Sequence, residues 1–283
     1  MFGLQKSLVY TGLFVLLWGS AAIFSRMALN EGNAFTVLVF RFALAVGVLL
    51  LIQCVRRQRL WPQVAWRQTL RAGLLLVAGY CAFYFLALEA GTTPSILATI
   101  LGVQPIVTLL VLERQAQTRK LIGLLLAFMG LVLLVWQGLL QAQVTVWGLL
   151  CALAALGCIT SGAVMQKQQR QDLVATLLAQ YGVSLLVFVA IMMVKGVLFV
   201  PSMTFFVTVG WLGVVISVLA QLLFYYLISA KSLVNTTSLF YLVPCVTVGM
   251  DYLFLGNTLT LTSLAGIAAV LLGIFMVFVT SSK

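Results

Sequence analysis

The segment FYFLALEAGTTPSILATILGVQPIVTLLVLERQ, at residues 83–115, has a counterpart at residues 224–259, FYYLISAKSLVNTTSLFYLVPCVTVGMDYLFLGNTL. The matching positions are Phe83-Tyr84 with Phe224-Tyr225, Pro105 with Pro244, and Gly123 and Gly130 with Gly266 and Gly273. Apolar sequences align easily by chance, so the prolines and glycines carry the comparison. The chain is therefore predicted to contain two copies of one unit, at residues 1–140 and 141–283.

Both copies consist of long apolar runs. Of the 283 residues, 63% are hydrophobic and only 7% are charged, which is too few charges to cover a soluble domain. A membrane-spanning helix needs roughly 20 apolar residues, and we expect one membrane domain, residues 1–283, whose first apolar run is a retained span and no cleaved signal peptide. The sequence divides into ten apolar segments: 8–29, 34–54, 71–90, 93–112, 120–137, 145–166, 173–195, 205–229, 233–254 and 262–280.

The number of spans in each copy is odd, so the second copy enters the bilayer from the side opposite to the first. The predicted fold is an all-α integral membrane protein with ten transmembrane helices, arranged as two inverted five-helix repeats. Inverted repeats are typical of secondary transporters, whose substrate sites lie near the bilayer midplane where the repeats meet.

The basic residues indicate the orientation of the chain. When the N-terminus is placed in the cytoplasm, every Lys and Arg falls on the cytoplasmic side except Arg26, Arg41 and Lys195. This asymmetry is what the positive-inside rule requires. Both termini are then cytoplasmic, and the net charge of +11 reports orientation and does not indicate binding to nucleic acid.

What the sequence lacks argues against an enzyme. It has no histidine, its five cysteines form no CxxC pair, and its five acidic residues are dispersed along the chain. Histidine and paired cysteines are the usual metal ligands and proton carriers. We therefore expect no catalytic residue, metal or cofactor, and the expected partners are a small-molecule substrate and the lipid bilayer. A receptor or scaffold would leave the inverted repeat unexplained.

The same residues resemble the drug/metabolite transporter superfamily, specifically its EamA-type exporters with ten helices. The motifs that carry the resemblance are Trp18-Gly19-Ser20 followed by Phe24 and Arg26, Arg41-Phe42 in the second span, the mid-helix prolines Pro105 and Pro244, and Glu113-Arg114 after the fourth span. The chain departs from the family at Gly256-Asn257, where Gly-Glu is usual, and its fourth span is short between Pro105 and Glu113.

The resemblance implies export of amino acids or related small neutral or zwitterionic metabolites across the cell inner membrane by alternating access. It also implies a cavity lined by helices 1, 3, 4, 6, 8 and 9. The alternative within the same fold is a translocator of lipid-linked substrates or lipophilic drugs. A cargo with a phosphate group would favour Lys or Arg at the centre of a span, and the sequence places none there.

Polar and aromatic side chains in the middle of spans are candidate substrate contacts, because polar groups that face lipid are costly. The candidates are Trp18, Tyr80, Tyr84, Gln104, Ser161, Gln221, Tyr225 and Tyr241. A primary amide has several groups to satisfy, and a tyrosine combines an apolar ring with a polar tip that suits a zwitterion. The alternative for each residue is hydrogen bonding between helices.

Other features of the spans bear on movement and coupling. Pro105 and Pro244 interrupt their helices and are either bending points for gating or static kinks. Arg41 and Asp251 are candidate intramembrane charges, and an acidic residue is expected to pair with the arginine. The sequence places no histidine or carboxylate at the centre of a span, which favours facilitated movement without obligatory proton exchange.

Small residues recur at a spacing of four in the last span of each copy. They are Gly123 and Ala127, and Ala265, Ala269 and Gly273. This spacing lets two helices approach closely. It either joins the two halves or forms a dimer, so we expect a monomer or a weak dimer.

Overall fold

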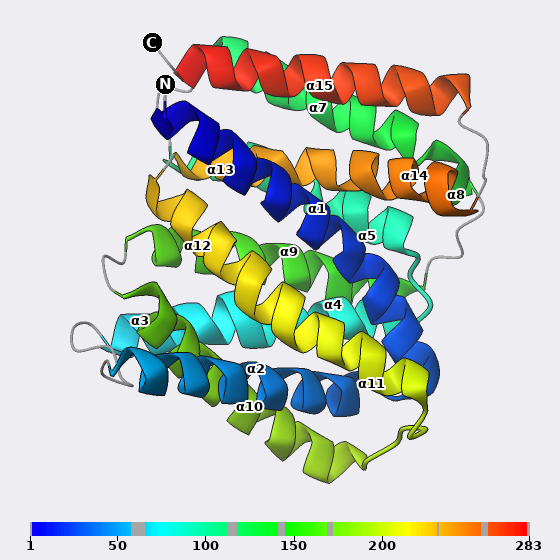
Figure 1. Ribbon diagram of the computed structural model, residues 1–283. Helices are drawn as coiled ribbons and strands as arrows, with labels where there is room; N and C mark the ends of the chain where they lie inside the picture. The colour runs from blue at the N-terminus through cyan, green and yellow to red at the C-terminus, as the bar shows by residue number, and fades with distance from the viewer. Residues whose placement is uncertain are drawn as a thin grey trace.

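The computed structural model describes residues 2–57, 66–112, 118–140, 145–168, 172–230, 232–255 and 260–281, and this part of the chain is helical with no strand (Figure 1). The uninterrupted helices are α1 (Phe2–Glu31), α2 (Ala34–Arg56), α7 (Thr118–Leu134), α8 (Trp136–Leu140), α9 (Val146–Lys167), α10 (Leu173–Lys195) and α15 (Leu261–Ser281). Within these described ranges, eight helical stretches are long and apolar enough to cross a bilayer. The prediction of an all-helical, multi-pass membrane protein is therefore confirmed.

Three of these stretches are built from shorter elements. Trp66–Glu89 consists of α3 (Trp66–Gly73), the π-helix η1 (Leu74–Gly79) and α4 (Tyr80–Glu89). Pro94–Leu112 consists of α5 (Pro94–Leu101) and α6 (Gln104–Leu112), and Met203–Ala230 of α11 (Met203–Gly210), the π-helix η2 (Trp211–Ala220) and α12 (Gln221–Ala230). π-Helical turns are rare and are frequently found at functional sites.

Two of the predicted spans correspond to shorter elements. The span predicted at 120–137 is mainly α7, which has 17 residues. The span predicted at 233–254 is divided into α13 (Leu233–Ser238), the 3₁₀-helix η3 (Leu239–Tyr241) and α14 (Leu242–Leu255). The interruption in this segment lies just before Pro244, which cannot donate a backbone hydrogen bond to the preceding turn.

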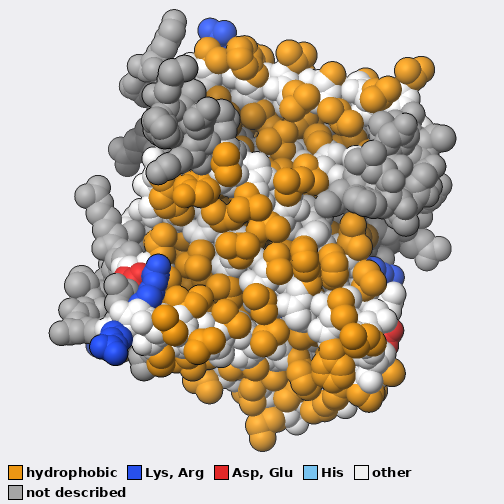
Figure 2. Space-filling view, in the orientation of Figure 1, with side chains coloured by type: hydrophobic (Ala, Val, Ile, Leu, Met, Phe, Trp, Pro, Cys, Tyr) orange, Lys and Arg blue, Asp and Glu red, His pale blue; other side chains and the backbone are white. Residues whose placement is uncertain are grey.

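The outer surface is apolar around the middle of the helix bundle. Figure 2 shows hydrophobic side chains across the face in view, with basic and acidic side chains near the two ends of the helices. Large hydrophobic residues are strongly exposed, for example Leu186 at 70%, Phe275 at 65% and Leu153 at 49%. An exposed band of this extent is what lipid contact requires, since water would penalise it.

The last helices of the two halves pack along each other at one edge of the bundle, and α2 and α10 pack at the opposite edge (Figure 1). A Cβ atom built on Gly130 would lie 2.7 Å from the carbonyl oxygen of Gly266, and one built on Gly123 would lie 2.8 Å from that of Gly273. The pairs run in opposite order, so α7 and α15 are antiparallel. The small residues therefore join two helices of one chain.

At one end of the bundle, the α1–α2 turn pairs with the segment between α10 and α11. The Asn33 N–H donates to the Leu198 carbonyl at 2.9 Å, and the Val200 N–H donates to the Glu31 carbonyl at 2.7 Å. The Glu31 carboxylate accepts a hydrogen bond from the Ser202 hydroxyl at 2.9 Å. At the same end, the Glu89 carboxylate accepts the Ala34 N–H at 3.1 Å. Both acidic side chains are thus used to tie loops together.

Candidate functional site

A cavity of about 130 Å³ lies inside the bundle. This central cavity is lined by residues of α1, α2, η1, α4, α5, α6, α9, α10, η2, α12, η3 and α14. A water molecule needs roughly 10–15 Å³ of such space, so the cavity can hold several waters or a small organic molecule. Each of the spans that the family resemblance implied contributes to the lining, and the second and seventh predicted spans contribute as well.

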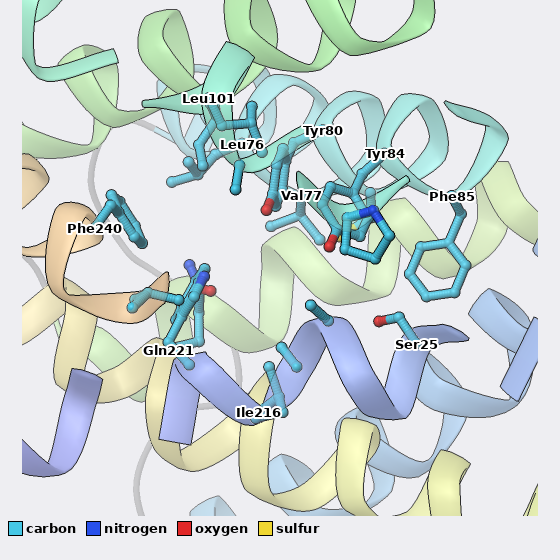
Figure 3. A pocket seen from close by; sticks show the side chains of 18 of the residues that line it. Ser25, Leu76, Val77, Tyr80, Tyr84, Phe85, Leu101, Ile216, Gln221 and Phe240 are labelled. Carbon is cyan, nitrogen blue, oxygen red and sulfur yellow. The ribbon is translucent and has the colours of Figure 1, made fainter. Parts of the chain in front are cut away.

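The structure brings most of the predicted site residues together around this cavity. Those that line it are Trp18, Tyr80, Tyr84, Gln104 and Gln221, with Pro244 and Arg41 beside them. In Figure 3, Tyr80 and Tyr84 point from α4 into the cavity, Ser25 of α1 lies on the opposite side of it, and Gln221 enters it from the start of α12. Side chains far apart in the sequence therefore converge on one space.

The two π-helical segments place polar side chains at this space. The π-helix η1 ends at Gly79, directly before Tyr80, and η2 ends at Ala220, directly before Gln221. A π-helical turn contains an extra residue, which rotates the following side chains relative to a regular α-helix. Because Tyr80 and Gln221 both line the cavity, the same local distortion positions a lining residue in each half.

Two groups of aromatic rings border the cavity. The ring of Trp18 lies 5.4 Å from the ring of Phe240 and 5.6 Å from that of Phe224, centroid to centroid. The rings of Tyr80 and Tyr84 are 5.7 Å apart. Such tilted and edge-to-face pairs fix ring orientation beyond simple burial. Trp18 therefore both packs within an aromatic cluster and presents a face to the cavity.

Gln104 has an amide nitrogen without a protein partner. The residue is 1% exposed, and its Nε2 atom has no hydrogen-bond partner among the described residues. It is the first residue of α6, after the break at Gly102 and Val103. The following residue, Pro105, cannot supply the backbone donor that the Leu101 carbonyl would otherwise receive, and Leu101 also lines the cavity.

Three predicted contacts lie away from the cavity. The Tyr225 hydroxyl donates to the Gln180 Oε1 atom, which is the helix-to-helix hydrogen bond that formed the alternative for this residue. Tyr241 is fully buried in the hydrophobic cluster around α7 and α15, and its hydroxyl has no partner in the described part of the chain. Ser161 is exposed on α9. Pro105 is buried beside the cavity without lining it.

Arg41 is inside the protein and reaches the cavity. It is 8% exposed, and its Nε–H donates to the Ser217 hydroxyl at 2.7 Å. Its guanidinium carbon lies 5.2 Å from the centre of the Phe42 ring. The Tyr181 hydroxyl donates to the backbone carbonyl of Ser217 at 2.5 Å. The expected acidic partner is not Glu31 or Glu89, which bond to loop groups, and the side chain of Asp251 lies outside the described residues.

Sequence reasoning missed several lining residues. Ser25, Tyr181 and Phe240 line the cavity and were not predicted to do so. A signal was present for Ser25, because Trp18, Ala21 and Ser25 recur at helical spacing on one face. The sequence carried no comparable signal for Tyr181, since its role follows from the packing of α10 against α2.

Comparison with known proteins agrees with the fold. The profile of the EamA-like transporter family matches the chain twice, at residues 5–136 and 146–279. The chain belongs to the EamA-like transporter family. This EamA-like chain is 27% identical over 256 residues to an uncharacterized transporter of Archaeoglobus fulgidus, and the match covers 86% of this chain and 87% of the relative.

The EamA-like chain has a second relative with a more informative name. It is 24% identical over 280 residues to a probable amino-acid metabolite efflux pump of Salmonella typhimurium, covering 93% of this chain and 92% of the relative. A solved crystal structure superposes on 98% of each chain with a TM-score of 0.83 and 15% sequence identity, which supports the fold alone. The protein is therefore a multi-pass membrane transporter for a small molecule.

Proposed function

We propose that this EamA-like transporter exports amino acids or related small neutral or zwitterionic metabolites across the cell inner membrane by alternating access. The observation that carries the proposal is the central cavity, which is lined both by aromatic side chains and by Gln104 and Gln221. Aromatic surface suits the apolar body of such a solute, and the amides suit its polar groups. The name of the Salmonella relative supports the same substrate class.

The proposal includes ten crossings in two inverted repeats, with both termini in the cytoplasm. The eight long stretches account for eight crossings. In this proposal, α7 and the interrupted segment α13–α14 make the other two. Support comes from the double match of the family profile and from the antiparallel packing of α7 against α15. The π-helices add to it, because η1 and η2 end four residues before Phe83 and Phe224, respectively.

Alternating access would use the two interrupted segments. Pro105 and Pro244 each follow a break in their helix, and Leu101 and Phe240, four residues before them, line the cavity. A break that adjoins a cavity can change its angle without exposing backbone groups to lipid. We assign both prolines to the segments that bend as access changes side.

The test of the proposed function is uptake of radiolabelled solutes into proteoliposomes. A panel of amino acids should include at least one that exchanges saturably against unlabelled solute inside. Exchange of lipophilic drugs or lipid-linked probes, with no amino acid exchanged, would favour the alternative cargo. Reporter fusions at Ser202 and after Lys283 test the topology, and they should report outside and inside, respectively.

A further inference from the structure

We propose that Arg41 binds a carboxylate group of the transported molecule. The inference rests on the proposed function and narrows the class of substrates proposed there. The cargo would be a small molecule with one carboxylate and an apolar or aromatic body, which includes the α-amino acids. Amines and amides of the same shape that lack a carboxylate would bind weakly.

Arg41 has donors to spare at the cavity. A guanidinium carries five N–H donors in a planar fork. One of them, Nε–H, is used by Ser217, and the remaining donors have no partner among the described residues while the side chain lines the cavity. A planar fork of this kind matches the two oxygens of a carboxylate.

The guanidinium is held in place from two sides. Ser217 accepts its Nε–H, and the Tyr181 hydroxyl bonds to the Ser217 backbone carbonyl. The ring of Phe42 lies beneath it at 5.2 Å. Groups that are fixed before the ligand arrives bind it without a further ordering cost. The arrangement is therefore a prepared anion site on the wall made by α2, α10 and η2.

No acidic side chain in the described part of the chain pairs with Arg41. Among the described residues that line the cavity, Arg41 is the charged one. The carboxylates of Glu31 and Glu89 accept hydrogen bonds at the loops, and that of Asp172 accepts the Val174 N–H and a Gln53 N–H. A buried charge is costly until it is paired, so a carboxylate brought by the cargo is the group that this site favours.

Other lining groups suit the rest of such a molecule. The unpartnered Nε2 atom of Gln104 is a second donor for an anionic group. The faces of Trp18, Tyr80 and Tyr84 offer apolar contact, and aromatic faces also attract an ammonium group. An α-amino acid can therefore place its charges on different walls without an acidic residue in the described lining.

The experiment compares four compounds that share a phenyl ring. Phenylalanine and 3-phenylpropionate carry a carboxylate, whereas phenylalaninamide and phenethylamine do not. Binding is measured on purified, full-length protein in detergent by intrinsic tryptophan fluorescence, because Trp18 lines the cavity. The proteins are the wild type, Arg41→Gln and Arg41→Lys, with Arg26→Gln as the matched control, since Arg26 bonds to the Leu88 carbonyl and does not line the cavity.

In the wild type, phenylalanine and 3-phenylpropionate should bind about tenfold to a hundredfold more tightly than phenylalaninamide and phenethylamine, which lack a carboxylate. This is the range expected for a hydrogen bond to a charged group. Arg41→Gln should abolish this preference, Arg41→Lys should retain part of it, and Arg26→Gln should leave it intact. Retained secondary structure and a monodisperse elution profile show that each variant is folded.

The proposal is overturned if the carboxylates have no advantage in the wild type, or if the advantage survives in Arg41→Gln. The first result would also follow if Asp251 paired with Arg41. Failure of the proposed function is a separate result, namely no exchange of any amino acid by wild-type proteoliposomes. Exchange that ignores the carboxylate would leave that function standing and remove the role of Arg41.

Discussion

Replacing Gln104 by methionine should stabilise the protein and impair transport at the same time. Gln104 is 1% exposed, and its Nε2 atom has no partner among the described residues. A buried donor without a partner costs about 1–3 kcal/mol. Methionine has a similar length and no N–H group, so the substitution removes this cost. Because Gln104 lines the cavity, the loss of its amide group should weaken substrate binding.

Gln180 provides a matched control with the opposite sign. It is fully buried, its Nε2–H donates to Gln166 Oε1 at 2.8 Å, and its Oε1 accepts from the Tyr225 hydroxyl. Gln180→Met leaves both partners buried and unpaired, so it should destabilise the protein by about 1–3 kcal/mol or more. The same chemical change therefore has opposite effects at two buried sites.

The assay is thermal unfolding in detergent, followed by circular dichroism without substrate. For a chain of about this size, 1 kcal/mol corresponds to roughly 2–4 °C in Tm. Gln104→Met should unfold a few degrees above the wild type, and Gln180→Met should unfold below it. Uptake by Gln104→Met proteoliposomes should fall. A lower Tm for Gln104→Met, or unchanged uptake, would show that Gln104 is a packing residue and not a substrate contact.

Three further perturbations test other parts of the account. Gly130→Ala places a methyl group 2.7 Å from backbone atoms of α15 and should cost about 1–3 kcal/mol, whereas Gly157→Ala, which meets nothing within 4 Å, should be neutral or stabilising in the same unfolding assay. Tyr84→Phe should raise the apparent KM of uptake with folding intact; if Tyr84→Phe and Tyr84→Ala both transport normally, Tyr84 is no part of the site. A pH gradient imposed at clamped membrane potential should drive no uphill accumulation; accumulation lost in Asp251→Asn would instead identify a coupling carboxylate.

Much of the fold follows from the sequence because bilayer thickness fixes the length of each span. Helix positions such as 34–54 and 173–195 agree with α2 and α10 to within a few residues. The π-helices were not predictable, since a change from i→i+4 to i→i+5 hydrogen bonding leaves no mark in a span that is apolar on most of its faces. The same holds for the η3 interruption, where only Pro244 gave a local sign.

The site was predictable where a side chain is unusual for its depth in the membrane. Trp18, Gln104 and Gln221 stand out in that way, and all three line the cavity. Tyr225 and Tyr241 have the same chemistry and face elsewhere, because helical rotation and neighbouring helices decide which face looks inward. Arg41 was placed by counting along α2, which gives its depth and does not reveal that it turns toward the cavity.

The most direct test of the central claim is the reactivity of a cysteine placed in the cavity. Gln221→Cys, in a background without native cysteines, should react with a hydrophilic thiol reagent, and a transported amino acid should slow the reaction. Leu222→Cys is the control on the adjacent position of α12, which is not among the residues that line the cavity, and it should react slowly whether or not substrate is present. A Gln221→Cys protein that is as inert as Leu222→Cys, or that substrate does not protect, would contradict the assignment of the central cavity as the transport site.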